Sequence, residues 1–151
     1  MAPAARPIPE GYHTITPYLC CRNAAGAIEF YKQALGATEL FAMKQPDGRV
    51  GHAELQIGTS RVMMGEPMGE FTAMPAMLHL YVEDCDALYK RAIDAGATPE
   101  MEITDQFYGD RSGGVKDLAG NMWWISTHKE DVPPEEMEKR AKAAMAGKTQ
   151  G

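Results

Sequence analysis

The side chains best suited to metal binding in this sequence are its four histidines and the carboxylates near them. His52 and Glu54 stand two residues apart, so on a strand their side chains would lie on the same face. Imidazole and carboxylate groups are common ligands of divalent metals. Together with His79 they would make a three-ligand set. The alternative is that His52 and Glu54 belong to the polar side of a strand and that His79 makes only a hydrogen bond.

The other reactive residue types carry no catalytic signature. None of the serines lies in a Gly-x-Ser-x-Gly motif. The three cysteines form neither a Cys-x-x-Cys pair nor a disulfide framework, and we expect them to be reduced and buried. His13 and His128 are expected to be solvated. The sequence therefore gives no support to nucleophilic catalysis, and no catalytic residue is assigned.

Length and charge exclude several classes of function. The chain has 151 residues, which corresponds to a single domain over 1–151 at the usual ~100–200 residues per domain. It contains no apolar run near the ~18 residues of a membrane span. The net charge is -6, so we expect no nucleic-acid partner. The N-terminal residues lack the apolar region of a signal peptide, which favours a cytoplasmic location.

The elements that would position these residues follow a regular order in the first half of the chain. Apolar, β-branched and aromatic residues predict a strand over 12–21. Asn23 is a favoured N-cap and Gly36 a typical C-terminal stop, which together predict a helix. Turns containing glycine separate three further expected strands, over 38–44, 50–57 and 61–65.

The second half repeats this order. A strand is expected over 76–82, and a helix between the N-cap Asp84 and Gly96. The letters Gly-Ala-Thr follow both predicted helices, at 36–38 and 96–98, which indicates an internal repeat. The remaining segments are a strand over 99–104, a polar glycine-rich loop over 108–114 and a hairpin of 115–118 with 122–127.

Each half therefore has the order strand, helix, strand, strand, strand, which places the chain in the α+β fold class. Module one spans 12–67 and module two spans 75–128. A further helix is expected over 133–146, because paired prolines begin it, acidic residues fill its first turns and basic residues its later ones.

Six short stretches of the sequence occur together in one order and spacing. They are Ala27–Tyr31 before Leu35-Gly36-Ala37, His52–Gly58, Asp84–Leu88, Gly109-Asp110-Arg111, Asp117–Asn121 and Trp123–His128. With the duplicated βαβββ unit, these stretches resemble the vicinal oxygen chelate superfamily of glyoxalases, bleomycin-resistance proteins and extradiol dioxygenases, and in particular its PhnB-like branch. The resemblance covers the chain from residue 12 to about residue 140.

The resemblance implies two tandem βαβββ modules whose curved mixed sheet encloses a cleft. In metal-dependent relatives, the ligands come from the first strand of each module and the last strand of one or both. The corresponding positions here fall on Thr16, Met77 and Trp124. A hydroxyl, a thioether and an indole are not ligands of a hard or borderline divalent cation. We therefore expect no metal cofactor, with the three-ligand set above as the alternative site for a divalent ion.

Alternation along the strands predicts which side chains would line the cleft. Trp123 and Trp124 are adjacent and must point to opposite faces of a strand, and we expect Trp124 in the cleft and Trp123 in the core. Arg111 would bind an anion from the rim of the cleft, or would pair with an acidic neighbour. The predicted ligand-binding residues are Thr16, Tyr18, Met77, His79, Tyr81, Met122, Trp124 and Arg111.

Aromatic rings and thioethers of this kind suit a flat or amphipathic small molecule. We therefore expect a cytoplasmic, homodimeric, PhnB-like protein that binds a small organic ligand without a metal, as bleomycin-resistance relatives sequester drugs. The alternative is a divalent-metal-dependent lyase, isomerase or dioxygenase of the glyoxalase type. A third interpretation gives the C-terminal helix a role in docking a partner protein.

Overall fold

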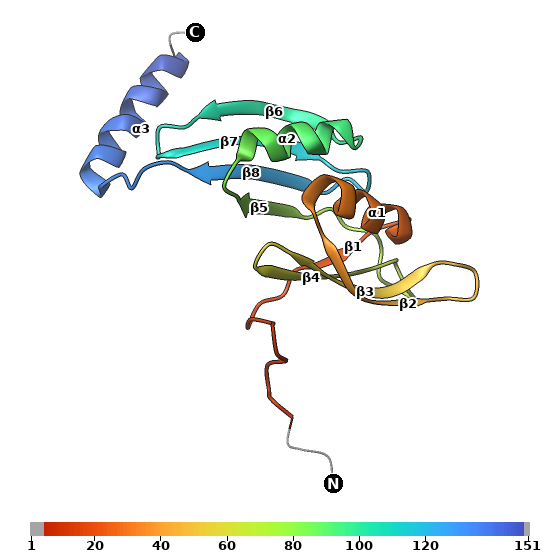
Figure 1. The fold of residues 1–151 in the computed structure, drawn as a ribbon. Coiled ribbons are helices and arrows are strands. Elements are labelled where there is room, and N and C mark those ends of the chain that lie inside the picture. The colour runs from red at the N-terminus through yellow and green to blue at the C-terminus, as the bar shows by residue number, and fades with distance from the viewer. Residues whose placement is uncertain (1–4, 150–151) are drawn as a thin grey trace.

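Two four-stranded sheets, each with one helix from its own half of the chain, form the body of the protein (Figure 1). The computed structural model describes residues 5–149. Sheet one has the strand order β1-β4-β3-β2, with β1 parallel to β4 and the other neighbours antiparallel. Its half of the chain contains β1 (Tyr18–Cys20), α1 (Ala24–Leu35), β2 (Thr38–Lys44), β3 (Val50–Ile57) and β4 (Ser60–Gly65).

Sheet two repeats this arrangement with the order β5-β8-β7-β6, in which β5 is parallel to β8. Its half contains β5 (Met77–Tyr81), α2 (Cys85–Asp94), β6 (Thr98–Asp105), β7 (Asp110–Lys116) and β8 (Met122–His128). The α+β class and the tandem βαβββ order are therefore confirmed.

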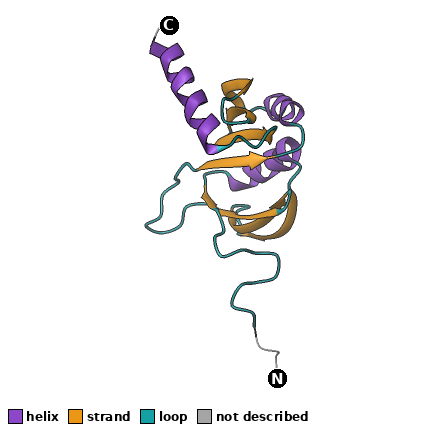
Figure 2. Cartoon of the chain, turned by 90° about the vertical axis from the view of Figure 1, so that its left-hand side faces the viewer, coloured by secondary structure: helices purple, strands orange, loops and turns teal. Residues whose placement is uncertain are grey.

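The two ends of the described chain extend away from this body. The helix α3 (Pro134–Thr149) projects from one end and residues 5–17 lead away from the other (Figures 1 and 2). Arg140 connects α3 to the body by donating to the carbonyl of Phe107 at 3.3 Å. Within residues 5–149, no helix has the length and apolar character needed to cross a membrane.

The predicted caps begin and end the first two helices. The Asn23 side chain accepts from the backbone N–H of Gly26, and Asp84 accepts from that of Ala87, which satisfies donors that the first turn leaves free. Gly36 ends α1 in the left-handed conformation, at φ 67°, where a side chain would be strained.

A buried polar cluster joins α1 to the second half of the chain. Tyr31 of α1 donates to the Asp117 carboxylate, which also accepts from the indole N–H of Trp123 at 2.8 Å. Asn121 donates to the Tyr31 hydroxyl at 3.1 Å. These residues are all at most 6% exposed. Because buried polar groups are costly unless they are paired, this cluster favours one arrangement of α1 against the β7–β8 hairpin.

Two segments differ from the sequence prediction. The first strand spans only Tyr18–Cys20, because it pairs with just the last three residues of β4. The expected glycine-rich loop is instead the strand β7, which pairs with both β6 and β8. A Cβ on Gly113 would lie 2.9 Å from the Met101 carbonyl, and one on Gly114 would lie 2.8 Å from the Met122 side chain. These glycines therefore allow close packing within a sheet, which composition alone does not distinguish from a loop.

Candidate functional site

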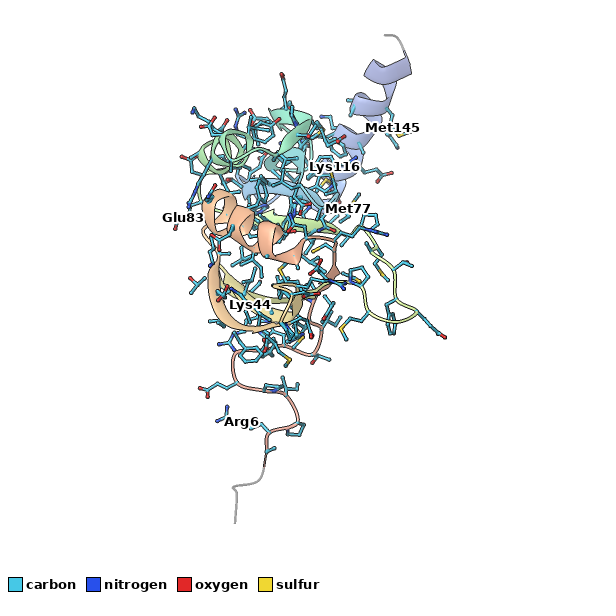
Figure 3. The ribbon with its side chains drawn as sticks, turned by 90° about the vertical axis from the view of Figure 1, so that its right-hand side faces the viewer. Arg6, Lys44, Met77, Glu83, Lys116 and Met145 are labelled. Carbon is cyan, nitrogen blue, oxygen red and sulfur yellow. The ribbon has the colours of Figure 1, made fainter. Side chains whose placement is uncertain are left out.

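Five of the predicted ligand-binding residues share one surface of sheet two. We call the face of each sheet that neither α1 nor α2 covers its open face. β5 and β8 pair in register, so Met77 lies beside Met122 and His79 beside Trp124. Tyr81 continues the row and is 64% exposed, and Met77 is 71% exposed. Figure 3 labels Met77 beside β5. The open face of sheet two thus presents a continuous row of aromatic and thioether side chains.

Tyr18 of β1 lies on the open face of sheet one, with its hydroxyl 3.4 Å from Nδ1 of His52. It lines a pocket of about 440 Å³ together with Met77 and His79, where β1 approaches β5. Thr16 lies before β1 and lines a different pocket, of about 240 Å³, with Tyr12. The structure therefore brings Tyr18, but not Thr16, to the residues of β5.

Arg111 lies on the opposite side of sheet two from the other predicted residues. Its Nε donates to Asp86 of α2 at 2.8 Å and its Nη1 to Asp105 at 3.2 Å. These two carboxylates raise the pKa of Arg111, and Arg111 lowers that of Asp86. The geometry matches the interpretation in which Arg111 pairs with acidic neighbours. Trp123 and Trp124 divide as alternation predicts, since Trp123 is 1% exposed in the core.

The alternative metal ligands do not come together in one chain. His52 and Glu54 lie on the open face of sheet one with Nε2 and Oε2 3.6 Å apart, and Glu54 accepts from the Tyr12 hydroxyl. His79 is bonded to Ser126 on sheet two at 2.8 Å. In the part of the chain that the structure describes, no three His, Cys, Asp or Glu side chains cluster as metal ligands. The residues present therefore do not fit a divalent metal centre within this chain.

A hydrogen-bonded series that the sequence analysis missed borders the open face of sheet two. The Tyr81 hydroxyl donates to Asp110 Oδ2 at 2.9 Å. Asp110 Oδ1 lies 2.7 Å from Nδ1 of His128, and Nε2 of His128 lies 2.7 Å from Asp131. Hydrogen bonds to Asp110 and Asp131 raise the pKa of His128, and the bond to Asp110 raises the pKa of Tyr81. Asp110 itself is 5% exposed.

A sequence signal for this series existed, but it was indirect. His128 is exposed, as expected, and its partner Asp110 lies in the Gly-Asp-Arg stretch, for which the sequence predicts a loop. Once β7 and β8 are paired, Asp110 and His128 stand directly opposite one another. Ser112, the next residue on the same face of β7, stands opposite Ser126, and its buried hydroxyl has no hydrogen-bond partner among the described residues.

A third pocket lies on the open face of sheet one. It has a volume of about 500 Å³, and its apolar walls include Tyr18, Met68, Phe71 and Met74. The Cys20 thiol belongs to the same wall and donates to the carbonyl of Thr72 at 3.3 Å. Cys21 and Cys85 are buried, as expected, whereas Cys20 is partly exposed at this pocket, and all three are free thiols.

Comparisons with known proteins agree with this architecture. The sequence model of the Glyoxalase/Bleomycin resistance protein/Dioxygenase superfamily matches residues 12–125. An uncharacterized protein of Mycobacterium tuberculosis (strain H37Rv) is 34% identical over 148 residues, which cover 91% of this chain and 85% of that protein.

Two solved structures have the same fold. TioX from Micromonospora sp. ML1 has a TM-score of 0.68 at 23% identity, over 77% of this chain and 98% of that one. A PhnB protein from Bacillus cereus has a TM-score of 0.58 at 18% identity, over 76% of this chain and 99% of that one. The match to the superfamily covers most of the chain and extends from before β1 into β8. The chain therefore belongs to the Glyoxalase/Bleomycin resistance protein/Dioxygenase superfamily.

Proposed function

We propose that this chain is a PhnB-like, cytoplasmic binding protein that holds a planar organic molecule on the open face of sheet two, without a metal. The observation that carries the proposal is the row of Met77, His79, Tyr81, Met122 and Trp124 on one exposed surface. Large apolar side chains in contact with water favour burial by a ligand or a partner. Flat rings and flexible thioethers accept planar molecules of different outline.

The residue types at the family's metal positions support binding without a metal. The resemblance implies that the metal ligands of metal-dependent relatives correspond to Thr16, Met77 and Trp124, and none of these side chains suits a hard divalent cation. The resemblance to bleomycin-resistance proteins, which sequester drugs, favours the same interpretation.

A second copy of this chain is the partner that we propose for the remaining apolar surface. Phe41 and Met43 lie on the open face of sheet one and are 48% and 53% exposed. A homodimer that covers this face would bury them.

Elemental analysis tests the metal-independent part of the proposal. Purified, untagged protein would be incubated with nickel, manganese, iron or zinc and then desalted. We expect no stoichiometric metal to remain. One equivalent of metal that is lost in His79→Ala would instead support a metal-dependent lyase, isomerase or dioxygenase that uses His52, Glu54 and His79.

Binding of a neutral planar probe tests the position of the site. We expect 2-methoxynaphthalene to bind the wild-type chain in saturation-transfer NMR. Trp124→Ala should weaken this binding by about 1–3 kcal/mol, because a stacked aromatic surface is lost. Leu118→Ala is the matched control, since Leu118 is 64% exposed at the turn before β8. Equal binding by the wild type and Trp124→Ala would contradict the assigned site.

A further inference from the structure

We infer that the open face of sheet two selects ligands that donate a hydrogen bond, and that the phenol oxygen of Tyr81 is the acceptor. This inference rests on the proposed function and specifies the class of ligand: a planar aromatic molecule carrying a neutral N–H or O–H group.

The direction of that proton follows from the partners of Asp110. A carboxylate only accepts hydrogen bonds, whereas a phenol can donate one and accept others. Asp110 accepts from the Tyr81 hydroxyl at 2.9 Å and from Nδ1 of His128 at 2.7 Å. The single proton of Tyr81 is therefore committed to Asp110, and the lone pairs of its oxygen remain for a ligand.

His128 and the burial of Asp110 hold this hydrogen bond in place. Nε2 of His128 lies 2.7 Å from Asp131, so both ring nitrogens face carboxylates, and both donate when the ring is protonated. Asp110 is 5% exposed, so its carboxylate is held in place and desolvated. Hydrogen bonds to a charged partner are shorter and stronger than neutral ones. Reversal of the Tyr81 hydroxyl would leave an oxygen of Asp110 without its donor, which is costly for a buried group.

The surface around Tyr81 is suited to a ring that carries such a donor. The imidazole of His79 stacks on Tyr81 with centroids 4.9 Å apart and planes at 30°, and Trp124 stands beside His79 in the sheet. Ser112 lies on the same face of the sheet, next to Asp110 on β7. Its hydroxyl has no partner in the described chain, but it is buried beneath this face and is not accessible to a ligand.

The negative charge of Asp110, next to Tyr81, also determines which ligands bind weakly. An anionic group placed at the phenol oxygen would meet an acceptor with the Asp110 carboxylate behind it. Neither group can donate a proton to it, and two negative charges repel. The net charge of the chain, -6, adds to this repulsion. The site should therefore prefer a neutral donor over an acceptor, and an acceptor over an anion.

Three probes of nearly equal shape test the inference: 2-naphthol, 2-methoxynaphthalene and 2-naphthoate. In the wild type we expect 2-naphthol to bind about two- to tenfold more tightly than 2-methoxynaphthalene, the range of one net hydrogen bond, and 2-naphthoate to bind most weakly. In Tyr81→Phe the preference for 2-naphthol over 2-methoxynaphthalene should fall to about one while the methoxy probe still binds. Tyr89→Phe, which removes a phenol from α2 on the opposite side of sheet two, should keep the preference.

The outcomes separate this inference from the proposed function. Binding of both neutral probes with equal affinity, or a preference that survives in Tyr81→Phe, would overturn the acceptor role of Tyr81 and leave the binding function standing. Failure of all three probes to bind the folded wild type would overturn both. Tightest binding by 2-naphthoate would also contradict the inference, since it would require a donor at the site.

Discussion

Two serines that stand opposite one another on β7 and β8 differ in their hydrogen bonds. Ser126 is fully buried and bonded to His79 at 2.8 Å, whereas the equally buried hydroxyl of Ser112 has no partner among residues 5–149. A buried donor without a partner costs free energy on folding, while a bonded one contributes to stability. The two positions are chemically alike, so they form a matched pair.

Alanine at these two positions should therefore have different effects on stability. Ser126→Ala should lower the free energy of unfolding by about 1 kcal/mol, because His79 loses its partner. Ser112→Ala should leave this free energy unchanged or raise it by up to about 1 kcal/mol, because an unpaired buried hydroxyl is removed. Urea unfolding of the two variants measures the difference, and an equal loss in both would contradict the pairing described here.

His128 should make stability depend on pH. Its hydrogen bonds to Asp110 and Asp131 raise its pKa above the ordinary value of 6.5. The folded state therefore binds this proton more tightly than the unfolded state does. The resulting stabilisation is fully present below pH 6.5 and is lost as the pH rises through the raised pKa. The charged groups near this ring are Asp110 on β7 and Lys129, Glu130 and Asp131 after β8. The titratable phenol of Tyr81 is bonded to the other side of Asp110.

Denaturant unfolding of the wild type and His128→Gln over this pH range measures the effect. The stability difference between the two should shrink as the pH rises above 6.5. His13→Gln is the control, because His13 is exposed and lies outside the helices and strands. Parallel curves for the wild type and His128→Gln at every pH would mean that the ring gains no proton affinity on folding.

At the scale of single residues, the sequence predicts what depends on strand alternation. The placement of Trp123 in the core and Trp124 on the open face follows from the period of two. The partners of Arg111 and His128 do not, because Asp86 and Asp110 lie 25 and 18 residues away in the chain. Contacts at such separation are set by the packing of elements, so a sequence pattern offers only candidates.

The segment between β7 and β8 is more than a turn, because its first and last residues belong to the buried cluster around Tyr31. Asp117 Oδ1 accepts from the backbone N–H groups of Ala119 and Asn121, and Oδ2 accepts from Tyr31 and Trp123. One carboxylate therefore shapes the hairpin and also binds α1 of the other half. In all four hydrogen bonds the Asp117 carboxylate is the acceptor.

Asp117→Asn should lower the free energy of unfolding by about 1–3 kcal/mol. The amide keeps only one acceptor oxygen, so buried donors on one side lose their partner. Asp94→Asn is the control, since Asp94 is bonded to Lys90 on the exposed surface, where ion pairs contribute little. Thermal or urea unfolding measures both, and equal stability of the two variants would contradict a structural role for the cluster.

Among the elements, the sequence predicts helices better than strand ends. Asn23, Gly36 and Asp84 mark α1 and α2 because a cap acts within a few residues of itself. The length of β1 depends on how far β4 runs beside it, and the identity of β7 depends on two neighbouring strands. Both features depend on contacts between residues that are distant in the sequence. The glycines at 113 and 114 therefore predict a loop unless the neighbouring strands are known.

At the scale of the whole molecule, the repeat in the sequence predicts two similar halves but not how they contact one another. The two helices lie side by side, and Arg91 of α2 donates to the carbonyls of Gln33 and Lys32 near the end of α1. Neither the Gly-Ala-Thr repeat nor the hydrophobic pattern contains this information, because each describes one half at a time.

If the homodimer forms through the open face of sheet one, a charged side chain placed on that face should weaken the dimer. Phe41→Glu should shift the chain toward a monomer in analytical ultracentrifugation, because an ionised carboxylate would have to be buried at the contact. Leu118→Glu places the same charge on an exposed site at the β7–β8 turn and should leave the oligomeric state unchanged. An unaltered dimer in Phe41→Glu would rule out this face as the contact.

The adjacent tryptophans also give the chain two fluorophores with different surroundings. Trp123 is 1% exposed with its indole N–H bonded to Asp117, and Trp124 is partly exposed on the open face. A collisional quencher such as acrylamide reaches only the second indole while the chain is folded. Occupation of the open face would shield Trp124 alone, whereas unfolding would expose both. A single quenching experiment could therefore separate ligand occupancy from loss of structure, with no label added to the protein.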